Sequence, residues 1–463
     1  MARARVSFEC TACGHRSVKW LGKCPDCSAW NTLVEVAPKK ETTGKAGARA
    51  AGARLAPRSP DRRPVPITQL AREGEPDRRL LSGVGEFDRI LGGGLVPGSV
   101  TLIGGEPGVG KSTLLLQVAS GLAREGHRVV YASGEESVAQ VRDRAVRLRG
   151  LHDLLFLQSE TELDRVLDGA KTAEPTVLVL DSVQTAFVPD VGSTPGSVSQ
   201  VREVAARLVL HAKSTGRAVL LVGHVTKQGE LAGPRTLEHI VDAVIYFEGS
   251  ANPPFRVLRG QKNRFGSTGE LGLFEMTSEG LREVAEPSAA LLQDRPSDRA
   301  GTVVTACMEG SRCLLLEVQA LVAPGFPGSV RRTALGIDPG RLAMLVAVLS
   351  KADHPLHDKE VYVNVVGGVR ITETAADLAV AAAVISSLLS RAPGADWIVL
   401  GEIGLTGEVR SVPRLDQRLA EAARHGFRRA LVPPVPRAFE PPAGIELVEA
   451  RTLEEAMGAL FAR

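Results

Sequence analysis

The chain has 463 residues, of which 56 are Lys or Arg and 53 are Asp or Glu, so its formal net charge is only +3. This length predicts two or three domains, and the near balance of charge excludes nucleic-acid binding through bulk charge. No segment approaches the roughly 18–20 consecutive apolar residues of a membrane helix, and no apolar signal core stands at the N-terminus. We therefore expect a cytoplasmic protein with no membrane partner.

Four of the six cysteines form two Cys-x-x-Cys pairs near the N-terminus, namely Cys10, Cys13, Cys24 and Cys27. This spacing suits one tetrahedral Zn²⁺ held by four thiolates, and in so short a segment the metal would supply the folding energy. Two disulfides, or a redox pair, are the alternatives, and both fit a reducing compartment poorly. The sequence predicts a zinc ribbon with four cysteine ligands over residues 1–36.

Residues 37–66 are basic and rich in Ala, Gly and Pro, without apolar periodicity. This composition predicts a flexible linker. Its cations can contact nucleic-acid phosphates, or the segment can serve only as a solvated tether.

A complete phosphate-binding loop follows the apolar run 99–103 and precedes a helical pattern over 113–122. The glycines let backbone N–H groups turn toward phosphates at a helix N-terminus. Lys111 would reach the β- and γ-phosphates, and the Ser112 hydroxyl would hold Mg²⁺. The sequence therefore predicts ATP or GTP binding by Gly105, Glu106, Pro107, Gly108, Val109, Gly110, Lys111, Ser112 and Thr113.

Strand-like runs alternate with amphipathic helical stretches between about residues 80 and 286, which is typical of a mostly parallel α/β sheet covered on both faces. The expected strands are 100–104, 128–133, 176–181, 218–223 and 243–247. The strand 176–181 ends in Asp181, which is the arrangement of a Walker B carboxylate that holds Mg²⁺ through water.

A second carboxylate cluster, Ser133-Gly134-Glu135-Glu136-Ser137, follows another expected strand. Ligands bind at such strand ends in open α/β sheets, so one of these carboxylates can orient the attacking water as a general base. The alternative is a helix cap, in which Ser133 is the N-cap and Glu136 completes a capping box. Both hold together if Glu135 is catalytic and Glu136 caps.

Two cations flank Asn263 in a glycine-bounded segment that we place in a loop beyond the last sheet strands. Lys262 and Arg264 can reach a phosphate, either in this subunit's own site or in that of a neighbouring subunit. Spacing alone also allows a solvated basic turn.

The chain resembles the bacterial RadA (Sms) DNA-repair family over its whole length. The resemblance rests on the two cysteine pairs, the loop 105–113, the segment 133–137 and Lys262-Asn263-Arg264-Phe265-Gly266, in that order. It implies a RecA-like ATPase, expected over residues 67–286, that prefers ATP and assembles as a hexameric ring. Such a motor would move on single-stranded and branched DNA to drive branch migration, with a recombinase as a candidate partner.

By the same resemblance, Glu135 matches the catalytic glutamate and His224 the residue that senses the γ-phosphate. Lys262 and Arg264 match residues that act on the neighbouring subunit's ATP. Two loops, 196–202 and 227–235, match segments that grip single strands. The candidate DNA contacts in these loops are Gln200, Arg202, Lys227 and Arg235.

Residues 299–463 form a third block, after a linker around 287–298, and the stretch 401–409 resembles the Lon protease domain. Ala375 stands at the position of the serine nucleophile and Asp416 at that of the lysine. Because a serine–lysine dyad needs both groups, we expect a Lon-protease-like (S5-type) α/β fold without proteolysis. We expect this block to act as a scaffold for ring assembly, with a DNA surface that would include Arg331, Arg332, Arg341 and Arg370.

Two cysteines of this block, Cys307 and Cys313, stand in apolar surroundings and are expected in the core. A signalling ATPase similar to KaiC and a Lon-like ATP-dependent protease are the alternative functions. The zinc module and the segment 262–266 favour the repair hypothesis.

Overall fold

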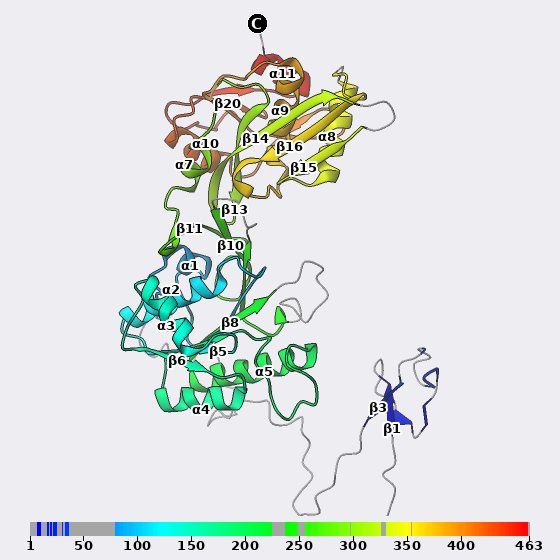
Figure 1. Cartoon of the computed structure of the whole chain (residues 1–463). Coiled ribbons are helices and arrows are strands. Elements are labelled where there is room, and N and C mark those ends of the chain that lie inside the picture. Colours follow the sequence, from blue (N-terminus) through cyan, green and yellow to red (C-terminus); the bar gives the residue numbers. More distant parts are fainter. Residues whose placement is uncertain are drawn as a thin grey trace, which may run out of the picture. The chain divides into compact units, whose positions relative to one another are not determined.

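The computed structural model describes residues 7–10, 16–17, 19–20, 22–25, 30, 33–36, 79–224, 237–248, 255–296, 298–325, 330–352 and 354–461. The chain divides into two compact units, Met1–Ala56 and Pro57–Arg463 (Figure 1). In the described part of the first unit, three strands pair antiparallel in the order β2-β1-β3. They are β1 (Ser7–Cys10), β2 (Arg16–Ser17) and β3 (Leu33–Val36).

Cys10 ends β1, and the Cys24 side chain is buried. Cys13 and Cys27 lie outside the described residues, so the arrangement of the four predicted zinc ligands stays a prediction.

The second unit begins with a sheet of nine strands in the order β12-β11-β10-β9-β4-β8-β7-β5-β6. The run from β9 to β6 is parallel, and β10, β11 and β12 extend it antiparallel. The parallel strands are β4 (Val100–Gly105), β5 (Val129–Ser133), β6 (Leu155–Ser159), β7 (Val177–Asp181), β8 (Ala218–His224) and β9 (Ala243–Glu248). The antiparallel ones are β10 (Phe255–Asn263), β11 (Leu271–Thr277) and β12 (Gly280–Glu283).

Helices cover both faces of this sheet (Figure 1). One apolar core lies under α1, α2 and α3 and the other under α4 and α5, because residues of alternating strand positions point to opposite faces. The helices are α1 (Gly85–Ile90), α2 (Lys111–Arg124), α3 (Val138–Arg147), α4 (Leu163–Ala173) and α5 (Val198–Thr215). This confirms the predicted α/β class, while β6 and the strands β10 to β12 were not among the strands expected.

The cap of α3 corrects one expectation. Ser133 is the last residue of β5, and the N-cap of α3 is Ser137, whose hydroxyl accepts from the Gln140 amide in a capping box. Glu136 instead forms an ion pair with Arg144. Two Ser-x-x-Glu/Gln patterns compete in this segment, and the structure uses the second.

The rest of the unit has a four-stranded sheet, β13-β14-β16-β15, a parallel three-stranded sheet, β17-β20-β21, and a hairpin of β18 and β19. The strands are β13 (Thr302–Glu309), β14 (Arg312–Pro324), β15 (Arg332–Leu335), β16 (Lys359–Val365), β17 (Trp397–Val399), β18 (Glu402–Ile403), β19 (Val409–Arg410), β20 (Arg429–Val432) and β21 (Glu446–Glu449).

The helices of this part are α7 (Pro287–Leu292), α8 (Pro339–Lys351), α9 (Asp377–Leu389), α10 (Leu415–Arg424) and α11 (Leu453–Phe461), with short 3-10 turns η2 (Val366–Gly368) and η3 (Thr374–Ala376). Helix α9 is almost wholly apolar and lies at the centre of the core. Cys307 is buried, as expected, and burial raises the pKa of its thiol. Burial also raises the pKa of the half-buried Cys313 to about 12.

Polar contacts join the nine-stranded sheet to the C-terminal part. Arg259 of β10 pairs with Glu309, and Arg312 pairs with Glu86 at 3.0 Å. The Glu270 carboxylate accepts from the Ser311 backbone N–H at 2.9 Å and from its hydroxyl at 3.0 Å. In the described segments, no helix is long and apolar enough to cross a bilayer.

Candidate nucleotide-binding site

Four neighbouring parallel strands bring the predicted catalytic residues to one edge of the sheet. The four strands lie in the order β4-β8-β7-β5. The phosphate loop follows β4, His224 ends β8, Asp181 ends β7, and Glu135 lies two residues past the end of β5. Gly105 is paired in register with His224, and Ser133 with Asp181. The carboxyl edge of a parallel sheet is where α/β proteins bind ligands.

The loop before α2 has the backbone that phosphate binding requires. Gly108 and Gly110 have φ values of +80° and +114°, which a side chain would strain. Gly110 is the N-cap of α2, and no side chain of the described residues caps this helix end. The first-turn N–H groups of α2 therefore remain free to bind an anion.

Lys111 is only 3% exposed, and its Nζ donates to the backbone carbonyls of Gly105 at 2.9 Å and Glu106 at 2.8 Å. Burial lowers the pKa of Lys111 to about 8, against the opposing charges of Asp181 and Glu135. The lysine and both carboxylates therefore follow neighbouring strand ends, and the two negative charges act on the ammonium.

Asp181 has one occupied and one open oxygen. Its Oδ2 accepts a hydrogen bond of 2.6 Å from the Tyr131 hydroxyl, whereas the buried Oδ1 has no partner among the described residues. An open carboxylate oxygen and the hydroxyl of the half-buried Ser112 are the kinds of oxygen donor that Mg²⁺ takes with a nucleotide. The residues present thus fit the metal, and Ser112 and Asp181 would hold it.

Glu135 is held by two donors. The Ser182 hydroxyl donates to its Oε1 at 2.6 Å, and the Nε2 of His224 lies 2.9 Å from the same oxygen. The hydrogen bond from His224 and that from Ser182 lower the pKa of Glu135 to about 2, although partial burial opposes them. The carboxylate is 38% exposed, so its other oxygen can meet a water molecule.

Lys262 and Arg264 lie at the opposite end of the strands, near the amino ends of the parallel strands. Lys262 is in β10, not in a loop as expected, and is paired with Val244, whereas Gly105 is paired with Phe247 on the same strand β9. Along β9, the partner of Lys262 and the partner of Gly105 are three residues apart, which is about 10 Å. Since β10 runs antiparallel to β9, Arg264 lies farther still from this chain's own phosphate loop.

Within the chain, the Lys262 ammonium donates to the carbonyls of Glu238 at 2.6 Å and Val241 at 2.8 Å. Desolvation and the charge of Arg264 lower the pKa of Lys262. The Arg264 side chain is half-exposed, 3.9 Å from Asp242. The turn that carries Arg264 is fastened by Arg79, which donates to the Phe265 carbonyl at 2.6 Å.

The candidate DNA contacts separate into three groups. Arg202 is exposed on α5, and Lys227 and Arg235 lie outside the described residues. The expectation for Gln200 is corrected: its side chain is 1% exposed, and its amide bonds to backbone groups of Val188, Val191 and Ser193. It closes the loop before α5 and has no atom left for a ligand.

In the C-terminal part, Ala375 is buried in η3 and Asp416 lies in the first turn of α10. Two residues after Asp416, the wholly buried Arg418 donates from both guanidinium nitrogens to Glu373, two residues before Ala375, at 2.6 Å each. An ion pair, and not a nucleophile with its base, therefore joins the two segments.

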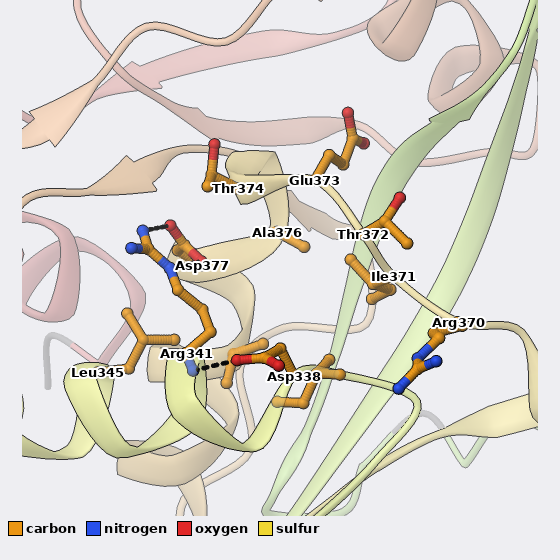
Figure 2. Close-up of a pocket in the computed structure, with 12 residues that line it drawn as sticks. Asp338, Arg341, Leu345, Arg370, Ile371, Thr372, Glu373, Thr374, Ala376 and Asp377 are labelled. Carbon is orange, nitrogen blue, oxygen red and sulfur yellow. Dashed lines mark hydrogen bonds and ion pairs between the residues drawn. The ribbon is translucent and has the colours of Figure 1, made fainter. Parts of the chain in front are cut away.

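A cavity of ≈ 330 Å³ lies between α8 and the segment 370–377. Figure 2 shows Arg341 and Asp377 facing each other across one side of it, with an Nε–Oδ1 distance of 2.9 Å, and Arg370 at the other side. The expectation for Arg341 is also corrected, because its guanidinium is bonded to Asp377 and to the Ile403 carbonyl. Arg331, Arg332 and Arg370 are exposed.

Two residues of the site were not singled out from the sequence, Tyr131 and Ser182. Ser182 directly follows Asp181, so its position next to the strand carboxylate could have pointed to it. Tyr131 lies on the same strand face as Ser133, so the two-residue period of a strand could have pointed to Tyr131.

Comparison with known families agrees with this architecture. A family described as an AAA domain matches residues 69–230, and a rubredoxin metal binding domain matches 8–35, a range that contains all four N-terminal cysteines. Residues 343–435 match a family described as subunit ChlI of Mg-chelatase.

Curated relatives match along the full chain. The DNA repair protein RadA of Pseudomonas aeruginosa is 48% identical over 462 residues, covering 100% of both chains, and that of Halalkalibacterium halodurans is 46% identical over 465 residues, also covering 100% of both. The Bacillus subtilis protein of the same name is 46% identical over 459 residues, or 99% of each chain. This chain therefore belongs to the RadA family of DNA repair proteins.

Proposed function

We propose that this chain is a DNA-dependent ATPase that drives branch migration in recombinational repair by translocating on single-stranded DNA. The observation that carries the enzymatic part is the meeting of Lys111, Asp181, Glu135 and His224 at one strand edge. The DNA part is supported by the relatives, whose name is DNA repair protein RadA.

In this proposal ATP is the substrate of the edge site. The free N–H groups of α2 and the Lys111 ammonium bind its phosphates. Bound Mg²⁺, held by Ser112 and Asp181, would supply charge neutralisation on the phosphate oxygens. Glu135 orients the attacking water, and His224 donates to the γ-phosphate when it leaves Glu135.

Lys262 and Arg264 act on a neighbouring subunit's ATP. Support comes from the strand register, which puts them at the edge opposite their own phosphate loop. In a homo-oligomeric ring, which we propose is a hexamer, the surface of one subunit that carries Lys262 lies beside the nucleotide site of the next subunit. ATP binding at this interface would then order the DNA-contacting loops.

The remaining assignments follow the family. Arg202, Lys227 and Arg235 would contact single-stranded and branched DNA, and Cys10, Cys13, Cys24 and Cys27 would bind Zn²⁺. We divide the chain into a zinc ribbon (1–36), a basic linker (37–66), the ATPase (67–286) and a Lon-like scaffold (299–463) that does not cleave peptides. The zinc ribbon is the candidate contact for DNA or a recombinase.

The test is ATP hydrolysis with and without single-stranded DNA for the parent chain, Lys111→Ala and Lys262→Ala. Lys111→Ala should lose nucleotide binding. Lys262→Ala should bind nucleotide like the parent and lose DNA stimulation. Hydrolysis that ignores DNA in the parent chain would favour a signalling ATPase, and full DNA stimulation in Lys262→Ala would refute the role in trans.

A further inference from the structure

Tyr131 reaches from the middle of β5 to the carboxylate at the end of β7. It is paired in register with Val179, two residues before Asp181, and lies on the same face of the sheet. Its hydroxyl donates to Asp181 Oδ2 at 2.6 Å, and its side chain is 1% exposed.

The bond divides the two oxygens of Asp181 between two tasks. Oδ2 is occupied by the phenol, and Oδ1 is buried without a partner among the described residues. Buried acceptors in folded proteins are nearly always satisfied, so an open one at the strand ends that carry the phosphate loop indicates a ligand. The negative charge of Asp181 also acts on the buried Lys111, which follows the neighbouring phosphate loop.

Asp181 is the one acceptor that the phenol has among the described residues. Its ring belongs to an apolar cluster with Ile103, Leu114 and Val179, so rotation of the Asp181 carboxylate away from it would leave a buried hydroxyl unsatisfied. The tyrosine thus fixes the plane of the carboxylate, as partners behind metal ligands do in general.

We propose that Tyr131 is a positioning residue that holds the Asp181 carboxylate so that Oδ1 alone faces the metal that accompanies the nucleotide. This rests on the proposed function, since it assigns Asp181 to Mg²⁺. Tyr131→Phe keeps the packed ring and removes only the oxygen that orients Asp181.

The experiment titrates Mg²⁺ into a fluorescent ATP analogue at fixed concentration and also measures binding of the analogue in EDTA, for the full chain and Tyr131→Phe. Removal of a partner behind a metal ligand lowers metal affinity about 10-fold or more. We expect the Mg²⁺ concentration at half-maximal binding to rise by about that factor, with unchanged affinity in EDTA. Excess Mg²⁺ should then restore the kcat of hydrolysis, which a general packing defect would not allow.

Tyr362→Phe is the matched control, because Tyr362 also donates to a carboxylate, Glu360, at 2.6 Å, but in the C-terminal part. It should behave like the parent. An unchanged Mg²⁺ dependence in Tyr131→Phe would overturn the inference, and so would equal losses of affinity in Mg²⁺ and in EDTA. If the parent itself shows no Mg²⁺-dependent nucleotide binding, the proposed function fails and the positioning role fails with it, whereas a normal parent with an unaffected Tyr131→Phe refutes the positioning role alone.

Discussion

The Nε2 atom of His224 lies 2.9 Å from Oε1 of Glu135, across the ends of β8 and β5. The other ring nitrogen, Nδ1, is buried and has no partner in the part of the chain that the structure describes. A hydrogen on Nε2 has Glu135 as its acceptor, whereas a hydrogen on Nδ1 would have none among the described residues. In this arrangement the imidazole donates to Glu135 and lowers its basicity.

His224 is also the last residue of β8, directly before a loop in which the family resemblance places DNA contacts. We expect His224→Ala to uncouple hydrolysis from DNA, because the residue that joins this loop to Glu135 is gone. The ratio of rates with and without single-stranded DNA should fall to about one. Steady-state hydrolysis with a DNA titration measures this ratio.

His152→Ala is the control, since His152 is an exposed histidine in a loop before β6. It should keep the parent ratio. DNA stimulation of parental size in His224→Ala would show that the contact between His224 and Glu135 carries no coupling.

The depressed pKa of Lys111, about 8, predicts a pH dependence of nucleotide binding. Below this pH the ammonium is present in the free protein, and above it the amine is neutral. Phosphates favour the charged form, so above pH 8 binding must take up a proton and ATP affinity should fall as pH rises. Calorimetric titration at about pH 8.5 in two buffers of different ionisation enthalpy measures the uptake.

Binding at about pH 6.5 serves as the internal control, because Lys111 is already protonated there and uptake through it should vanish. Equal proton uptake at both values, or none at the higher one, would contradict this assignment of the buried ammonium.

Local signals in the sequence predicted which residues lie at the carboxyl ends of the central strands. The loop before Lys111 and the carboxylate after 177–180 are each defined by a strand and its next few residues, so the parallel sheet brings them together without further information. The local sequence could not decide whether Ser133 or Ser137 caps the helix, because each of them precedes a Glu or Gln by three residues.

The features that the sequence did not reveal depend on pairing between segments far apart in the chain. Whether Lys262 serves its own site depends on the direction and register of β10 against β9, which no short motif encodes. Likewise, Gln200 looks like an exposed polar residue in sequence, and only the loop that folds over it shows that it is buried.

Arg79 ties the turn of Arg264 to the segment before β4. One of its nitrogens donates to the Phe265 carbonyl at 2.6 Å and the other to the Leu91 carbonyl at 2.8 Å. We expect Arg79→Ala to loosen this turn and to reduce DNA-stimulated hydrolysis about 10-fold, because a misplaced charge loses most of its effect on a transferring phosphoryl group. ATP affinity, measured by fluorescence, should be unchanged.

Arg165→Ala removes an arginine that forms a solvent-facing ion pair on α4, and it should leave both quantities as in the parent. Equal DNA-stimulated rates in the two variants would show that the turn keeps its position without Arg79.

The ion pair of the wholly buried Arg418 with Glu373, whose side chain is 23% exposed, predicts a large stability effect in the C-terminal part. Arg418→Met leaves the Glu373 carboxylate without its charge partner, and breaking a buried pair from one side costs about 3–5 kcal/mol. Urea unfolding followed by the fluorescence of Trp397, which is buried in this part, reports the loss. Arg410→Met, which breaks a pair in which the arginine side chain is 59% exposed, should cost about 1 kcal/mol or less.

A double variant separates charge from packing. Glu373→Gln combined with Arg418→Met removes both charges, and the amide oxygen can still accept from the Met308 backbone N–H, as the carboxylate does at 2.8 Å. The double variant should therefore be more stable than Arg418→Met alone, because no uncompensated charge remains buried. If Arg418→Met loses no more stability than Arg410→Met, the pair does not hold the segments of Ala375 and Asp416 together.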